Sequence, residues 1–295
     1  MTDERRHYLI YITANDLSTY LDDFFNFDDM ARFAPGVPQV NVVIAVSQVN
    51  PFSDFDKMVL GMLRWRIEKS KHLKVTNILL KGNIGRDFSS TKVCLDTLID
   101  VAKDDSFVLV RNRSSYGPIC KNWFSAFAEQ YSKYSDTGLV GSTISLNGHP
   151  SMPNPEGAIH VQTYCYFSQW RHLKDMIDDF PGSKSLDRIS TIVDGEIELS
   201  KRIMSHGLKI SCLNWPDIYF DSSILNALPD FGGCLNGNIK KLPFRYKMYR
   251  KSLRRPRGLL LGMLWIVLIK VLAFSYASFR WKISKENYQR LYEYD

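Results

Sequence analysis

Long apolar runs alternate with helical patterns along this chain, and this alternation narrows the possible folds more than any other feature. Runs rich in β-branched residues occur at residues 7–13, 40–47, 75–82 and 106–112, with further candidates at 137–145 and 160–168. Such continuity is typical of strands in a parallel sheet that is buried on both faces. Helical spacing of apolar residues fills the intervals, at residues 55–73, 90–103 and 122–134. The alternation predicts an α/β fold in which helices flank a mostly parallel, doubly wound sheet.

Charge is distributed unevenly between two regions. The chain of 295 residues has a net charge of +7, but residues 240–295 alone carry 14 Lys/Arg against three Asp/Glu. Residues 1–239 are therefore acidic overall, with a net charge of −4. A chain of this length has room for one large domain or two small ones. We expect one α/β domain over residues 1–239 and a distinct C-terminal region over residues 240–295.

The C-terminal region combines a polybasic segment with an apolar one. Residues 240–257 hold nine Lys/Arg and no acid, and residues 258–279 are mostly apolar. A polybasic stretch beside an apolar helix is typical of proteins that sit on an anionic membrane surface. The residues expected to contact that membrane are Lys247, Arg250, Arg254, Arg255 and, as an interfacial aromatic anchor, Trp265.

The apolar segment at residues 258–279 is compatible with three interpretations. It forms an in-plane or shallowly inserted helix, a helix that spans the bilayer, or a core helix of the body. A span needs about 20 apolar residues. This segment reaches that length only by including Lys270, Ser275 and Ser278.

Several features that the sequence lacks constrain the partners and the cellular compartment of the protein. Clusters of Lys/Arg also attract nucleic acid, but the body is acidic and carries no nucleic-acid-binding motif, so we predict no nucleic-acid partner. The five cysteines are scattered and form no CxxC pair, which indicates neither a zinc site nor a disulfide framework. The first residues lack the pattern of a signal peptide. We therefore expect reduced thiols and a body that faces the cytoplasm.

Polar residues follow the third predicted strand, at the edge of the sheet where open α/β folds bind ligands. The sequence there is KGNIGRDFSS, in which Gly82 and Gly85 free the backbone. The guanidinium of Arg86 suits a phosphate, and the carboxylate of Asp87 can accept from a ribose or a base. A helix expected to begin at Ser89 or Ser90 adds an N-terminus that favours anions. The alternative is a turn held by an Arg–Asp pair.

The fourth predicted strand ends in a similar polar cluster, followed by Gly117-Pro118. Enzymes of the GT-A architecture, which act on nucleotide sugars, usually carry an Asp-x-Asp metal motif at this place, because a diphosphate leaving group needs cations to stabilise its charge. This chain has Asn112-Arg113-Ser114 instead. One possibility is that Mn²⁺ or Mg²⁺ is held weakly through oxygens of Asn112 and Ser114. Another is that arginine side chains supply part of the positive charge that the metal would provide. A solvated basic turn without a ligand is the third possibility. The cluster consists of Arg111, Asn112, Arg113, Ser114 and Ser115.

Two later segments supply candidate acid–base groups. His160 and Gln162 alternate to one face of a predicted strand, so both can point into a cleft, although a lone histidine is often structural. Asp194, Glu196 and Glu198 follow at the start of a helix, in a helical pattern that spans residues 187–207. Transfer with inversion needs a base for the acceptor hydroxyl, and one of these carboxylates is the natural candidate. Acids favoured by a helix N-terminus are the structural alternative.

The motifs in this order resemble a group of bacterial surface-polysaccharide glycosyltransferases, which includes rhamnan-synthesis-like proteins and galactofuranosyltransferase domains of O-antigen and capsule assembly. The resemblance spans about residues 75–215 and rests on residues 83–87, 112–118, 140–145, 160–167 and 196–200. It implies a GT-A-like, Rossmann-like fold and transfer of galactofuranose or another hexose from a nucleotide-diphosphate donor such as a UDP-sugar. The implied acceptor is a lipid-linked glycan at the cytoplasmic face of the inner membrane, which agrees with the basic C-terminal region and a peripheral or monotopic location.

The resemblance also implies roles for individual residues. Glu196 is the expected base, with Asp194 second. His160 and Gln162 are expected to line the donor or acceptor pocket, and any metal is expected at Asn112 and Ser114. The chain departs from the pattern at Arg113, where an acid is expected between the Asn and the Ser. The expected donor-binding residues are Thr13, Asn83, Arg86, Asp87, Asn112, Arg113 and Ser114. The missing Asp-x-Asp motif keeps a second function open, a non-catalytic, membrane-associated nucleotide-binding scaffold of a polysaccharide assembly complex.

Overall fold

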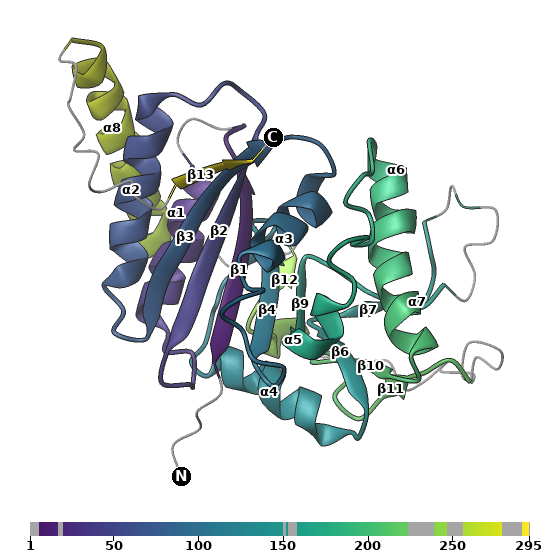
Figure 1. The fold of residues 1–295 in the computed structure, drawn as a ribbon. Coiled ribbons are helices and arrows are strands. Elements are labelled where there is room, and N and C mark those ends of the chain that lie inside the picture. The colour runs from purple at the N-terminus through teal and green to yellow at the C-terminus, as the bar shows by residue number, and fades with distance from the viewer. Residues whose placement is uncertain are drawn as a thin grey trace.

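The computed structural model describes residues 6–16, 20–149, 152, 158–223, 239–246, 256–278 and 291–294. Its centre is a nine-stranded sheet in the order β11-β10-β6-β9-β4-β1-β2-β3-β13, with helices on both faces (Figure 1). The strands of this sheet are β1 (His7–Ala14), β2 (Val40–Gln48), β3 (Leu73–Gly82), β4 (Phe107–Asn112), β6 (Thr137–Gly141), β9 (Cys165–Gln169), β10 (Lys209–Cys212), β11 (Tyr219–Phe220) and β13 (Leu291–Tyr294).

The four strands β3, β2, β1 and β4 run parallel, as the sequence predicts. In the central strand β1, Leu9 pairs with Val42 on one side and with Leu109 on the other. These three side chains are fully buried, and so are their neighbours along β1 on the opposite face of the sheet. Helices cover both faces, which is the physical reason for the continuous apolar runs.

The other half of the sheet contains both parallel and antiparallel pairs, and two of the strands expected from the sequence are each broken into two. Strand β9 lies between β4 and β6 and is antiparallel to both. The expected strand at 160–168 is broken into β8 (His160–Val161) and β9, and the one at 137–145 into β6 and β7 (Ile144–Ser145). Strands β7 and β8 pair with each other in a separate small sheet. This break turns the chain out of the main sheet beside the candidate site.

Helices divide into two layers around the sheet (Figure 1). One hydrophobic cluster joins the sheet to α1, α2 and α4, and a second joins its other face to α3, α5 and α7. Short segments α6 (Arg188–Ser190) and the π-helix η1 (Thr191–Ile197) lead directly into α7. The remaining helices are α1 (Leu21–Arg32), α2 (Asp54–Glu68), α3 (Arg86–Asp96), α4 (Trp123–Lys133), α5 (Trp170–Lys174) and α7 (Glu198–Ser205).

A long C-terminal helix, α8 (Pro256–Ser278), packs outside α1 and α2. Trp265 stacks on Phe24 of α1 with ring centroids 4.3 Å apart, and Ile269 is 2% exposed. Gly262 permits this approach, because a Cβ there would lie 2.5 Å from the Phe25 ring. The prediction that Trp265 is an interfacial anchor is therefore wrong, since its side chain lies in the core. The other predicted membrane contacts, Lys247, Arg250, Arg254 and Arg255, lie outside the described residues.

The segment that precedes α8 also contributes to the body. Phe244 is fully buried in the same hydrophobic cluster as Leu9 and Trp265. Strand β12 (Arg245–Tyr246), which follows the short helix η3 (Ile239–Lys241), pairs with β5 (Ser115–Tyr116). Part of the region predicted as a tail is thus built into the fold. Within the described portion of the chain, no helix has the combined length and apolarity required to cross a bilayer.

Candidate active site

One cleft of about 780 Å³ lies where β1, β2, β3 and β4 end. The structure thus brings together residues that the sequence predicts from five separate segments. Among the side chains that line it are ten of those predictions: Thr13, Asn83, Arg86, Asp87, Asn112, Arg113, Ser114, His160, Gln162 and Glu196.

The first wall of the cleft is the start of α3. Gly85 and Arg86 both have positive φ angles, 70° and 45°, so the helix begins there and not at Ser89 or Ser90 as predicted. Only glycine fits at position 85, because a Cβ would lie 1.9 Å from the Ser183 carbonyl oxygen. Arg86 is consequently presented at the helix N-terminus, exposed and facing the cleft.

A hydrogen bond joins this wall to the end of β4. The Nδ2 atom of Asn112 donates to Oδ2 of Asp87 over 2.6 Å, and its Oδ1 atom accepts from the Ser114 amide at 3.0 Å. Burial raises the pKa of Asp87, although the bond from Asn112 and the guanidinium of Arg113 oppose the rise. Asn112 therefore orders both the Asp87 carboxylate and the turn at Ser114.

Arg113 ties the end of β4 to the end of β1. Its guanidinium donates to the Ala14 carbonyl oxygen over 3.1 Å and forms an ion pair with Asp16. The side chain is 20% exposed and lines the cleft. Nearby, burial raises the pKa of Asp23 to about 6, and the Arg113 charge opposes this shift. Tyr11 donates to Asp23 over 2.8 Å.

Arg111, the other arginine of the predicted polar cluster, is structural. It is fully buried and donates to the backbone carbonyl oxygens of Ser115 and, over 2.8 Å, Gly117. Its guanidinium also lies 4.5 Å from the ring centroid of Phe244. These contacts hold the turn after β4 on the core, so Arg111 is not presented to a ligand.

Glu196 and His160 lie close together on one wall of the cleft. Oε2 of Glu196 lies 3.9 Å from Nε2 of His160, while Nδ1 of His160 lies 2.7 Å from the Ala158 carbonyl oxygen. Burial lowers the pKa of His160, so the ring is neutral at pH 7. Because a carbonyl oxygen only accepts, the ring proton is on Nδ1 and Nε2 is an acceptor.

The carboxyl group of Glu196 has the property expected of a general base near neutral pH. Burial raises its pKa from an ordinary value of 4.5 to about 7, although hydrogen bonds from the backbone and side chain of Thr163 oppose the rise. A catalytic group works best when its pKa lies near the working pH. Glu196 sits in the π-helix η1, and such segments are frequent at functional sites.

Asp194 is not placed to share this role. Its side chain is exposed and is absent from the residues that line the cleft. The reason is the packing of its neighbour Gly195, where a Cβ would lie 2.4 Å from the Phe88 ring. That contact presses one side of η1 onto α3 and leaves Asp194 outside. The second choice for the catalytic carboxylate is therefore corrected.

Several lining residues were not predicted from the sequence. Arg188 and Thr191 belong to the segment before Glu196, and Tyr246 comes from β12, far along the chain. Thr163 and Tyr164 occupy the break between β8 and β9. A polar Gln-Thr-Tyr interruption inside an otherwise apolar run was the one available sequence signal for this break.

The oxygen donors of the cleft do not match the requirements of a divalent cation. Among the described residues no three His, Cys, Asp or Glu side chains form a group that could hold a metal. The side-chain oxygen of Asn112 accepts from Ser114 and its amide donates to Asp87. Arg113, which lies between the two predicted ligands in the sequence, brings a positive charge to the same cleft. Mg²⁺ and Mn²⁺ prefer several carboxylate or water oxygens in near-octahedral geometry. This donor set does not fit such an ion.

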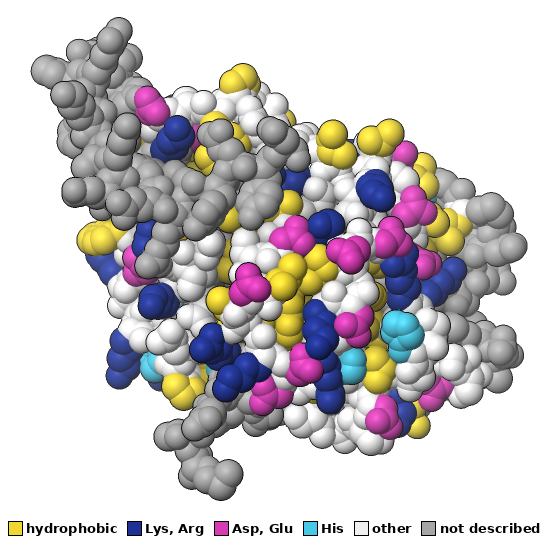
Figure 2. All heavy atoms as spheres, in the orientation of Figure 1, with side chains coloured by type: hydrophobic (Ala, Val, Ile, Leu, Met, Phe, Trp, Pro, Cys, Tyr) yellow, Lys and Arg dark blue, Asp and Glu magenta, His cyan; other side chains and the backbone are white. Residues whose placement is uncertain are grey.

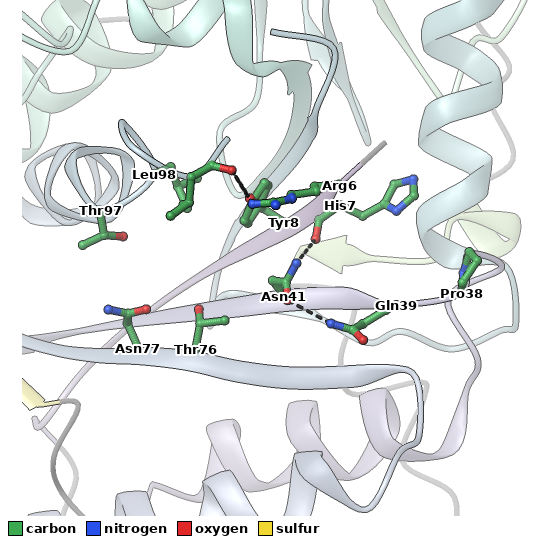
Figure 3. A pocket seen from close by; sticks show the side chains of 11 residues that line it. Arg6, His7, Tyr8, Pro38, Gln39, Asn41, Thr76, Asn77, Thr97 and Leu98 are labelled. Carbon is green, nitrogen blue, oxygen red and sulfur yellow. Dashed lines mark hydrogen bonds between the residues drawn. The ribbon is translucent and has the colours of Figure 1, made fainter. Parts of the chain in front are cut away.

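A second cleft, of about 630 Å³, lies at the opposite edge of the sheet (Figure 3). Its lining includes Arg6, Tyr8, Asn41 and Thr97, without any acidic residue. Asn41 and Gln39 bond to each other over 3.1 Å, and Arg6 donates to the Val101 carbonyl oxygen over 2.7 Å. None of the predicted site residues lines it, and it offers no carboxylate base.

Several solved structures resemble the chain at low sequence identity. The mannosyltransferase PcManGT from Pyrobaculum calidifontis, in complex with GDP-Man and Mn²⁺, is 11% identical with a TM-score of 0.46, covering 95% of this chain and 82% of that one. The galactosyltransferase LgtC, with donor and acceptor sugar analogs, is 8% identical with a TM-score of 0.45, covering 90% and 95%. A 4-diphosphocytidyl-2C-methyl-D-erythritol synthase is 11% identical with a TM-score of 0.36, covering 75% and 96%. No protein-family model matches the chain, and no curated protein matches it.

Proposed function

We propose that this chain is a glycosyltransferase that moves a hexose from a nucleotide-diphosphate donor to a hydroxyl group of a glycan. The observation that carries the proposal is the single cleft in which a phosphate-compatible rim faces a carboxyl group with a pKa near 7. In open α/β sheets this edge is the ordinary place for a nucleotide. The sequence resemblance to surface-polysaccharide glycosyltransferases supports the same reaction class.

The donor is held by the start of α3 and by the ends of β1 and β4. Arg86 and the N-terminus of α3 face the diphosphate, since both favour anions. Asp87, ordered by Asn112, accepts a hydrogen bond from the nucleoside. Thr13 and Asn83 complete this side of the lining. The sugar then lies toward the opposite wall, which carries His160 and Glu196.

The chemical step is a displacement at the anomeric carbon. The acceptor hydroxyl oxygen forms a bond to that carbon, and the bond from the carbon to the diphosphate oxygen breaks. The nucleoside diphosphate leaves with the electron pair, and the acceptor proton passes to the ionised carboxylate of Glu196. This course inverts the anomeric configuration. The neutral His160, whose Nε2 lies 3.9 Å from the carboxyl group, lines the cleft beside Glu196.

A panel assay tests this activity. The full chain is incubated with UDP-, GDP-, CDP- and dTDP-sugars, with and without a lipid-linked glycan acceptor, and released nucleoside diphosphate is measured. We expect turnover with one donor class, and Glu196→Gln should lower it by roughly 10² to 10⁴-fold while the protein stays folded. Asp194→Asn, an equivalent change on the exposed side of the same segment, is the matched control. Turnover by Glu196→Gln at the wild-type rate would exclude Glu196 as the base.

We further propose that the acceptor is lipid-linked and that the protein works at the cytoplasmic face of the bacterial inner membrane. Helix α8 supports this location. Its outer face carries exposed apolar side chains at helical spacing, opposite the face that packs on α1. These side chains are Leu260, Met263, Leu264, Val267, Leu268 and Val271.

The occupant proposed for this face is an anionic bilayer surface. The polybasic segment at residues 240–257 immediately precedes and overlaps the start of α8, so basic and apolar residues are adjacent in the sequence. Over the rest of the body, Lys/Arg and Asp/Glu side chains are interspersed on the face seen in Figure 2. An in-plane helix with an apolar side and neighbouring cations binds anionic lipid in two ways: its apolar side chains are buried, and its cations are attracted to the headgroups.

Vesicle flotation tests the location. The full chain should bind phosphatidylglycerol vesicles, and the double change Leu264→Glu with Val267→Glu should weaken binding roughly tenfold or more, since each apolar side chain contributes about 1.5–3 kcal/mol on burial. Ile99→Glu changes an equally exposed aliphatic side chain elsewhere and should have no effect. Unchanged binding by the double variant would contradict the membrane role of α8.

A nucleotide-binding scaffold without catalytic activity is the second candidate. The observation in its favour is Arg113, which stands where an acid is expected and is paired with Asp16. Under this alternative the panel assay yields donor binding but neither transfer nor hydrolysis. The raised pKa of Glu196 favours the enzyme, because a scaffold has no use for a carboxyl group poised near pH 7.

A further inference from the structure

We infer that the cleft holds the diphosphate of its donor through guanidinium groups and works without a divalent cation. This inference rests on the proposed function, because it assigns the partners of the same donor. It starts from Arg113, the residue at which the chain departs from the pattern of its resembled family.

The positive charge of Arg113 interacts with several carboxylates near the donor side of the cleft. Its guanidinium pairs directly with Asp16, and its charge also acts on Asp23 and Asp87. Of these carboxylates Asp87 lines the cleft and is partly buried, and an uncompensated negative charge in such a site is costly. A divalent ion normally compensates such a charge. In this chain a covalently attached cation already does so, and it would repel a metal ion brought to the same place.

The geometry leaves Arg113 able to bind phosphate as well. A guanidinium has five N–H groups, and the bonds to Ala14 and Asp16 use two of them. The Arg113 side chain lines the cleft and is held in place by these bonds, and its backbone is held by the turn in which the Ser114 amide donates to Asn112. A preorganised guanidinium loses little conformational freedom when it binds a phosphate.

Two further arginines supply the remaining charge. Arg86 lies at the start of α3 and Arg188 at the start of α6, and both line the same cleft as Arg113. Each is exposed in the structure. The three side chains approach from three different elements, so together they can surround a diphosphate. Fixed cations of this kind can stabilise the charge that develops on a leaving diphosphate.

Calorimetry with the full chain separates this inference from the proposed function. UDP, GDP, CDP and dTDP are titrated in excess EDTA and again with Mn²⁺ or Mg²⁺. We expect one nucleoside diphosphate to bind in EDTA with a Kd within about threefold of its value with metal. Binding that appears only with metal would overturn the guanidinium site and leave the proposed function intact. No binding under either condition would overturn the proposed function itself.

Substitution at position 113 provides the second test. Arg113→Asp should weaken binding in EDTA about tenfold to hundredfold, the range for one lost charge-assisted bond, and added Mn²⁺ should restore part of it. Arg113→Lys should retain more affinity than Arg113→Asp. Arg64→Ala removes an arginine that pairs with Glu68 outside the cleft and should bind like the wild type. Wild-type affinity of Arg113→Asp in EDTA would refute the role of Arg113, and the wild-type EDTA titration still decides the question if that variant fails to fold.

Discussion

Nε2 of His160 lies 3.9 Å from Oε2 of Glu196, while the other ring nitrogen of His160 bonds to the backbone of Ala158. The pKa of Glu196 is raised to about 7, with burial as the main cause. The protonation of this carboxyl group is therefore linked both to activity and to stability.

The first prediction concerns the pH dependence of activity. A base must be ionised to accept the acceptor proton, so kcat/KM should rise about tenfold per pH unit below pH 7 and level off above it. The measurement is a pH profile of donor turnover between pH 5.5 and 8.5. A flat profile over this range would contradict the assignment of Glu196.

The second prediction concerns stability. Because the folded pKa of Glu196 is raised from 4.5 to about 7, the folded state holds a proton that the unfolded state has released between these values. Wild-type stability should therefore fall as pH rises from 4.5 to 7, and Glu196→Gln should remove this fall. We expect the variant to gain about 2 kcal/mol relative to the wild type between pH 5 and pH 8. Urea unfolding at both pH values measures it, and a gain that does not change with pH would count against the shift.

The third prediction concerns the glycine beneath the catalytic carboxylate. Gly195→Ala would bring a Cβ to 2.4 Å from the Phe88 ring, so η1 must move away from α3. Overpacking of this kind typically costs about 1–3 kcal/mol, and the displaced Glu196 should lower turnover. Gly82→Ala is the matched control, because no atom lies within 4 Å of its added Cβ. Equal thermal stability of the two variants would show that η1 is not held in this way.

The fourth prediction concerns the attachment of α8. Trp265→Ala removes a side chain that stacks on Phe24 and is 6% exposed. We expect a loss of about 3–4 kcal/mol in the free energy of unfolding. Met263→Ala, on the exposed face of the same helix, should change stability by less than about 0.5 kcal/mol. Equal effects of the two changes in urea unfolding would indicate that α8 does not pack through Trp265.

The parallel half of the sheet could be predicted because its strands are buried on both faces. Strands such as β1 and β4 show this burial as uninterrupted apolar sequence. Helix α1 was not predicted, and its buried face explains why. Asp23 and Asn26 lie on that face and bond to Tyr11, so its apolar pattern is interrupted by residues whose burial depends on partners elsewhere in the fold.

The donor side of the cleft could be predicted for a related reason. Parallel strands end at one edge, so the polar residues that follow β3 and β4 were both expected at the donor site, and a hydrogen bond of 2.6 Å joins Asp87 to Asn112 there. The roles of Arg111 and Trp265 could not be predicted from local sequence. Arg111 is held by the carbonyl groups of a turn, and Trp265 by an aromatic ring some 240 positions earlier. Such contacts depend on tertiary packing, which leaves no periodic trace.

A crystal structure of the full chain with a non-transferable nucleotide sugar tests the proposed reaction most directly. We predict the diphosphate within hydrogen-bond distance of Arg113 and Arg86, and the anomeric carbon turned toward Glu196. A donor bound outside this cleft, or bound in it with the anomeric carbon facing away from Glu196, would contradict the proposed transfer.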